Sequence, residues 1–115
     1  MDEYQATIVR IVDADTAIVQ ISLGFRLYQE MPLRLFGINA PEIRGPSRPA
    51  GLAAKAFVES VLPVGATVRV RTYKDAKEKY GRYLADVYYG DGVLLTYLNQ
   101  ELVEKGLAIP YLESK

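Results

Sequence analysis

The sequence predicts a mainly β fold with added α-helices: a five-stranded, partly open barrel with two helices packed on it. Five segments are rich in β-branched residues or alternate between apolar and polar positions, and two others have helical spacing. A chain of 115 residues has room for one core. Five antiparallel strands in so short a chain must curl into a barrel or leave hydrophobic edges exposed. We therefore expect one domain over residues 1–115.

The first three predicted strands follow one another directly. Residues 5–12 are rich in β-branched side chains, and residues 16–23 alternate between apolar and polar positions. The turn Asp13-Ala14-Asp15 joins them as a hairpin, and Gly24-Phe25-Arg26 forms the next turn. The third strand opens at Pro32 and runs to about residue 38.

A predicted helix with Pro49 in its first turn ends before Pro63 and Gly65. Its expected apolar positions are Leu52, Ala53, Ala56, Phe57, Ser60 and Val61. Residues 66–73 then alternate as a fourth strand, and residues 74–79 form a charged loop.

Residues 83–89 form the fifth predicted strand, which ends at Gly90-Asp91-Gly92. A second helix covers roughly residues 94–105, with its apolar stripe at Leu95, Leu98 and Leu102, and Gly106 ends it. Residues 107–111 form a short tail against the core. A partly open barrel of the OB type satisfies this order of elements.

The composition narrows the chemistry that is available. Lysine and arginine balance aspartate and glutamate at 14 each, so any attraction to a polyanion must come from a local basic patch. The absence of cysteine and histidine removes thiolate sites, the commonest general base and the commonest zinc ligand. A metal here must be a hard cation that prefers oxygen ligands. With no apolar run of membrane-spanning length and no signal-peptide pattern, we expect a soluble, cytoplasmic monomer that makes no membrane contact.

Residues 34–42 combine an apolar strand with a polar exit. The stretch supplies the guanidinium of Arg34, the amide of Asn39, the backbone carbonyl of Ala40 and the carboxylate of Glu42, which follows the stiff Pro41. Arg34 either extends to solvent at a barrel rim or points at an anion. Glu42 can act as a general base, or else form an exposed ion pair with its neighbour at position 44.

Two other segments match this stretch chemically. Asp13 and Asp15 lie in a hairpin turn, where aspartate also occurs for turn chemistry alone. Residues 79–82 read Lys-Tyr-Gly-Arg, in which Tyr80 can stack on a base and Arg82 can bind a phosphate, although a solvated hairpin tip has the same composition. Together the three segments suggest a metal-assisted site for phosphodiesters.

The three segments, in this order and approximate spacing, resemble the staphylococcal nuclease family of calcium-dependent nucleases on an OB-fold barrel. The resemblance covers nearly the whole chain and extends to Gly106-Leu107-Ala108 after the last predicted helix. The longer C-terminal helix of the family has no counterpart in this sequence. It implies cleavage of DNA and RNA to leave 3'-phosphates and 5'-hydroxyls.

The resemblance implies calcium ligands at the side chains of Asp15 and Asn39 and at the carbonyl of Ala40. Asn39 stands where the best-known member has a second aspartate, so we expect weaker calcium binding, which Asp13 offsets in part. Ala14 stands where a glycine is usual between the aspartates, which raises the question of whether this turn needs a positive φ.

The resemblance also implies roles in catalysis and substrate binding. Glu42 would activate the attacking water, Arg34 and Arg82 would stabilise the pentacoordinate transition state, and Lys79 and Tyr80 would hold the neighbouring phosphate or nucleotide. We expect an active, calcium-dependent endonuclease that prefers single strands. The competing hypothesis is a catalytically weak or inactive barrel that binds nucleic acid or a protein partner.

Overall fold

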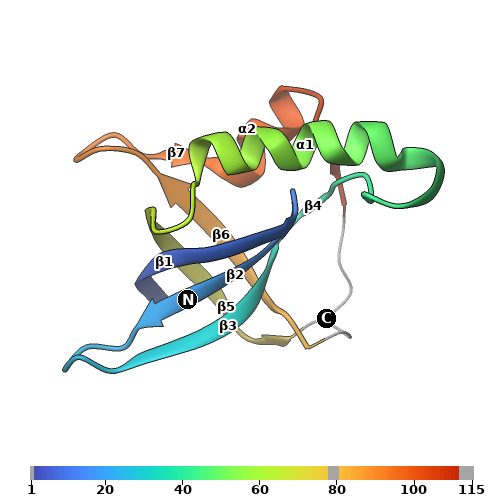
Figure 1. Ribbon diagram of the computed structural model, residues 1–115. Helices are drawn as coiled ribbons and strands as arrows, with labels where there is room; N and C mark the ends of the chain where they lie inside the picture. Colours follow the sequence, from blue (N-terminus) through green and yellow to red (C-terminus); the bar gives the residue numbers. More distant parts are fainter. Residues whose placement is uncertain (1, 78–80, 112–115) are drawn as a thin grey trace.

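The computed structural model describes residues 2–77 and 81–111 and shows a barrel covered by helices (Figure 1). Its elements, in chain order, are β1 (Asp2–Asp13), β2 (Thr16–Ser22), β3 (Tyr28–Leu35), β4 (Ile38–Asn39), a 3-10 turn (Gly45–Ser47), α1 (Arg48–Val61), β5 (Thr67–Lys77), β6 (Tyr83–Tyr89), β7 (Thr96–Tyr97), α2 (Leu98–Glu104) and β8 (Ile109–Pro110). The predicted fold class, an OB-type barrel with two helices, is confirmed.

The barrel is closed by a parallel pair of strands. The strand order is β3-β2-β1-β5-β6, and all four of these pairings are antiparallel. Residues 33–35 of β3 then pair in parallel with residues 83–85 of β6. The expectation of a partly open, wholly antiparallel barrel was wrong on this point. Four successive reversals of direction leave the first and fifth strands running the same way, so a five-stranded barrel can close only through a parallel pair.

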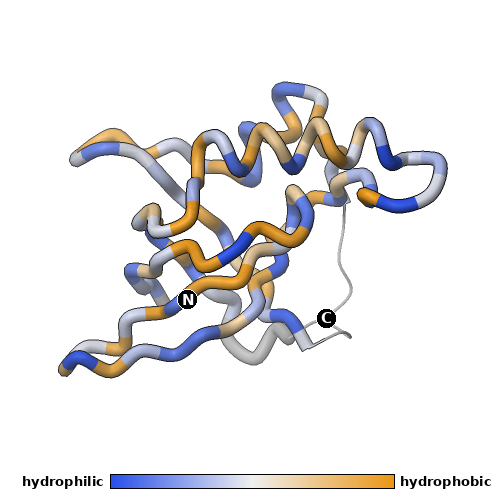
Figure 2. The backbone as a smooth tube through the Cα atoms, in the orientation of Figure 1, coloured by the Kyte–Doolittle hydropathy of each residue, from blue (hydrophilic) through white to orange (hydrophobic). Residues whose placement is uncertain are grey.

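Both helices lie over one end of the barrel (Figure 1). Val58 and Leu62 at the end of α1 and Leu98 of α2 line the same small interior cavity as side chains from β1, β2, β3 and β6. Hydrophobic and hydrophilic residues alternate along the strands, as barrel walls require (Figure 2). Within the described ranges, neither helix has both the length and the hydropathy that crossing a bilayer demands.

The buried stripe of α1 differs from the predicted one. Its buried residues are Gly51, Ala54 and Val58, whereas Leu52 is 40% exposed. Ala53, Ala56 and Ser60 are exposed as well, and only Phe57 and Val61 of the predicted set are partly buried. A helix this rich in alanine carries apolar residues on more than one face, so packing on β1 decides which face is buried.

Several strands and helices begin or end at other residues than the sequence predicts, for identifiable reasons. The third strand begins at Tyr28 and stops at Leu35, because Gly37 with φ +81° separates it from β4. Strand β5 continues to Lys77, so much of the predicted loop is strand, and residues 78–80 lie outside the described part. Helix α2 starts at residue 98, later than predicted, because residues 96–97 pair with β6.

The turns at the ends of the elements behave as the sequence predicts. Gly106 has φ +71° and donates its N–H to Val103, while Leu107 donates to Leu102, which is the Schellman arrangement that ends a helix. Phe25 and Arg26 form the predicted turn with positive φ. Among the described non-glycine residues no others have positive φ, so alanine fits the hairpin turn at position 14 without strain.

Two of the tyrosines donate hydrogen bonds to the buried carboxylate of Asp86. The hydroxyls of Tyr73 and Tyr97 donate hydrogen bonds to Asp86 at 3.0 and 2.8 Å. Tyr73 stacks on Phe36, and Tyr97 stacks on Tyr88. Burial and the nearby Asp86 raise the pKa of Tyr73 to about 12. These rings therefore pack against one another and satisfy a buried anion.

Candidate active site

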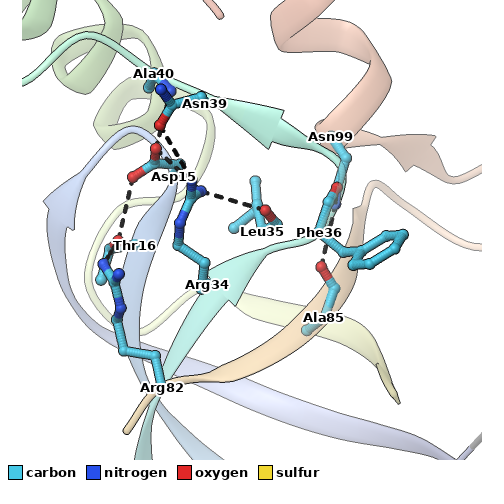
Figure 3. A network of polar contacts seen from close by, with 10 residues as sticks. All are labelled: Asp15, Thr16, Arg34, Leu35, Phe36, Asn39, Ala40, Arg82, Ala85 and Asn99. Atoms are coloured by element: carbon cyan, nitrogen blue, oxygen red, sulfur yellow. Dashed lines mark hydrogen bonds and ion pairs between the residues drawn. The ribbon is translucent and has the colours of Figure 1, made fainter. Parts of the chain in front are cut away.

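Asp15 is the centre of a buried polar network where the β1–β2 hairpin meets the end of β3 (Figure 3). Asp15 as a whole is only 6% exposed. Oδ2 accepts the backbone N–H of Ala40 at 2.8 Å and contacts the Arg34 guanidinium at 3.0 Å. Oδ1 accepts the hydroxyl of Thr16 at 3.1 Å. Asp15 is thus more than a turn residue, because it connects three separate segments.

Arg34 is buried beside Asp15. Arg34 is 6% exposed, and the pairing of β3 with β2 places it opposite Thr16. Nη2 donates to Oδ1 of Asn39 at 3.1 Å, and Nη1 donates to the carbonyl of Leu35 at 3.3 Å. Of the two interpretations of Arg34, contact with an anion is the one observed, and that anion is the carboxylate of Asp15.

Arg82, the residue just before β6, belongs to the same network. Its Nη1 donates to Oγ1 of Thr16 at 2.9 Å. Thr16 in turn donates to Asp15, so a continuous chain of contacts runs from Arg82 through Thr16 and Asp15 to Arg34 (Figure 3). One guanidinium therefore contacts the buried carboxylate directly, and the other is connected to it through the hydroxyl of Thr16.

The chemistry of these donors suits a hard cation. Oxygens of Asp15 and Asn39 already converge on one positive group, the guanidinium of Arg34, and both are ligand types that calcium prefers. The backbone N–H of Ala40 donates a hydrogen bond to Oδ2 of Asp15. In the part of the chain that the structure describes, no three acidic side chains cluster as a metal group. A cation bound here would therefore depend on neutral oxygens besides one carboxylate.

Glu42 lies beside this network on an open cleft. The cleft measures about 310 Å³ and is lined by Glu42 and Asp13, among others. Burial raises the pKa of Asp13, with a further contribution from Asp15, whereas Lys55 and Arg82 oppose the increase. The alternative ion pair between Glu42 and Arg44 is absent, and both residues are fully described. Lys79 and Tyr80 lie outside the described residues.

The backbone that carries Glu42 is held by the start of α1. Ser47 Oγ donates to the Glu42 carbonyl at 2.9 Å, and Arg48 Nη1 donates to the Ile43 carbonyl at 3.2 Å. Gly51 packs against this backbone so closely that a Cβ there would lie 2.5 Å from the carbonyl carbon of Glu42 and nearer still to its oxygen. The sequence analysis missed Gly51, and a glycine in a helical interior was the available signal.

Replacing Gly51 by alanine should destabilise the protein, although alanine is the better helix former. Alanine would gain about 0.5–1 kcal/mol from helix propensity, but overpacking against backbone costs about 1–3 kcal/mol. We expect urea denaturation to show a lower free energy of unfolding for Gly51→Ala, by about 1 kcal/mol. Leu52→Ala, at the exposed neighbouring position, should change it by no more than about 0.5 kcal/mol. An increase for Gly51→Ala would contradict the tight contact.

Asn99 anchors the turn that follows β3. Its Nδ2 donates to the carbonyls of Phe36 and Ala85 at 2.9 and 3.1 Å (Figure 3). Its Oδ1 accepts the N–H of Val87 at 3.0 Å. The residue is 2% exposed. Thr16 and Asn99 were both missed in the sequence, where each looks like an ordinary strand or helix residue. Asn99 fixes the end of β3 and hence the path of the chain toward Asn39.

The fold and the site together define a nuclease-like OB barrel with a carboxylate and two arginines at one strand end. The chain belongs to the staphylococcal nuclease homologue family, whose sequence model matches residues 32–115. That range contains Arg34, Asn39, Glu42 and Arg82 and leaves out Asp15.

Relatives of known sequence agree with this family. A thermonuclease of Staphylococcus intermedius is 34% identical over 86% of this chain and 55% of its own length. A thermonuclease of Staphylococcus hyicus is 31% identical over 93% of the chain and 59% of its own length. An uncharacterized protein of Methanocaldococcus jannaschii is 28% identical over 98% of the chain and 62% of its own length. The chain thus spans between 55% and 62% of the length of these relatives.

Proposed function

We propose that this protein is a calcium-dependent endonuclease that hydrolyses phosphodiester bonds of DNA and RNA, preferably in single strands, and leaves 3'-phosphate and 5'-hydroxyl ends. The observation that supports this most directly is the chain of contacts from Arg82 through Thr16 and Asp15 to Arg34. Two guanidiniums that belong to one network supply the positive charge with which the equatorial oxygens of a phosphodiester would pair.

The remaining residues supply the other parts of a hydrolysis. Glu42 is exposed on the cleft, so its carboxylate can hold a water and accept its proton. Arg34 and Arg82 would offset the negative charge that grows on the phosphoryl oxygens in the transition state. Bound by Asp15, Asn39 and the Ala40 carbonyl, calcium would polarise a phosphoryl oxygen. Lys79 and Tyr80 would contact the adjacent nucleotide.

Cleavage of an end-labelled single-stranded oligonucleotide across a calcium series tests the proposal. We expect cutting that rises with calcium and stops when a chelator is added. Products should resist polymerase extension until a phosphatase removes the 3'-phosphate, and the 5'-hydroxyl ends should accept phosphate from a kinase. Extension without phosphatase would contradict the proposed bond scission.

The competing function, a nucleic-acid-binding barrel without catalysis, gives a different result in the same experiment. It predicts a salt-sensitive mobility shift of the oligonucleotide with no cleavage at any calcium concentration. The observation that favours it is the absence of a second carboxylate at position 39. Cleavage that persists in chelator would contradict both functions.

A further inference from the structure

The oxygens that would bind calcium already bind a cation that belongs to the protein. Asp15 Oδ2 contacts Arg34 Nη1 at 3.0 Å, and Asn39 Oδ1 accepts Arg34 Nη2 at 3.1 Å. The carbonyl of Leu35 accepts a third contact from the same guanidinium at 3.3 Å. Figure 3 shows the Arg34 side chain pointing between Asp15 and Asn39. This is a three-oxygen shell around a positive group.

The guanidinium is held there firmly. Arg34 and Asp15 have side chains that are only 8% and 9% exposed, so solvent screens their attraction weakly. Oδ2 of Asp15 also accepts the Ala40 N–H at 2.8 Å, and Oδ1 accepts Thr16. Oδ2 therefore has two donors, one for each of its lone pairs, and a cation that binds this oxygen must take the place of one of them.

We propose that Arg34 is the resident cation of this site, and that its guanidinium must leave the oxygens of Asp15 and Asn39 before calcium binds them. This inference depends on the proposed function only for the identity of the metal and its ligands. Calcium affinity would then be set by how readily Arg34 is displaced, in addition to the number of charged ligands. Arg34 would be a determinant of metal affinity as well as a phosphate-binding residue.

Arg82 provides a matched comparison. It carries the same charge and belongs to the same network, and its Nη1 donates to Oγ1 of Thr16, whereas Arg34 contacts the side-chain oxygens of Asp15 and Asn39 directly. Removing either arginine removes one positive charge near the site. Removal of Arg34 also frees the oxygens of Asp15 and Asn39 that it contacts, so a larger effect of this variant than of the Arg82 variant separates displacement from simple charge repulsion.

Titration of the metal-free protein with calcium chloride at constant ionic strength, followed by calorimetry, measures the effect without any cleavage. We expect Arg34→Gln to lower the calcium dissociation constant by about tenfold or more, as loss of a like charge within ~4 Å allows. Arg82→Gln should lower it by less than about threefold, because it leaves the contacts of Arg34 with Asp15 and Asn39 in place. Equal changes in the two variants, or loss of binding in Arg34→Gln, would overturn the proposal.

Arg34→Gln leaves Asp15 buried without its ion pair, so its fold should be checked by thermal denaturation with and without calcium. Arg34→Lys retains the charge but offers a single nitrogen in place of two. It should fold and bind calcium with an affinity between those of the wild type and Arg34→Gln. An affinity equal to that of the wild type would overturn the role of the two-oxygen contact. Calcium-independent cleavage by the wild type would instead count against the proposed function alone.

Discussion

Replacing Glu42 by glutamine is expected to lower the turnover number for oligonucleotide cleavage by about 10²–10⁴-fold, the range that general-base catalysis supplies. Glutamine keeps the size of the side chain but cannot accept a proton from water. The carboxylate is exposed on the cleft and forms no ion pair with Arg44, so the substitution breaks no ion pair between these two residues. Single-turnover cleavage at saturating calcium and enzyme measures the effect directly.

Binding should respond differently from turnover. Because Glu42 would act on the water and not on the substrate, Glu42→Gln should bind the oligonucleotide at least as tightly as the wild type, since one negative charge is gone. Glu59→Gln is the matched control: Glu59 is also exposed and lies on α1, away from the cleft lining. Comparable turnover for Glu42→Gln and Glu59→Gln would remove Glu42 from the mechanism.

Replacing Asn99 by alanine is expected to lower the free energy of unfolding by about 3 kcal/mol or more. Two buried backbone groups would lose the partner that Asn99 provides, namely the carbonyl of Phe36 and the N–H of Val87, and each unpaired group costs about 1–3 kcal/mol. The carbonyl of Ala85 would lose one of its two donors and keep the N–H of Phe36. Urea denaturation measures this difference when the free energy of unfolding falls with urea concentration at the same slope in both proteins.

Two further variants of this segment sharpen the test. Asn99→Asp has nearly the same shape but cannot donate to the two carbonyls, so it should be about as destabilising as alanine. Gln100→Ala changes the exposed next residue, whose amide contacts only Glu104, and should shift the stability by no more than about 0.5 kcal/mol. A loss below about 1 kcal/mol for Asn99→Ala would mean that water or a local shift replaces its bonds.

Much of the fold could be predicted because local patterns agree with it. β-branched content and alternation together identified all five barrel strands, and Gly106 correctly ended the last helix. The face of α1 could not be predicted, because an alanine-rich helix offers more than one apolar stripe, and contact with the Glu42 backbone selects the one that contains Gly51. The exposed residues 28–30 joined β3 because the backbone ladder with β2 needs no apolar side chains.

The site was predictable as a set of residue types and unpredictable as a set of contacts. The motifs identified Asp15, Arg34, Asn39 and Arg82, and the structure places all four in one network. Nothing in the spacing indicated that Thr16 would connect Arg82 to Asp15. That contact spans 66 positions along the chain and exists only because barrel closure brings β6 beside β3.

The sequence by itself determined the family, the types of the elements and the residues available for chemistry, because motifs and periodicity are local properties of the chain. Only the tertiary structure decided that Arg34 is buried between Asp15 and Asn39 and not extended to solvent. The physical reason is that a buried guanidinium is tolerated only where oxygens satisfy it. Those oxygens come from the turn between β1 and β2, from the end of β3 and from β4, and the pairing of β2 with β3 places that turn beside Arg34.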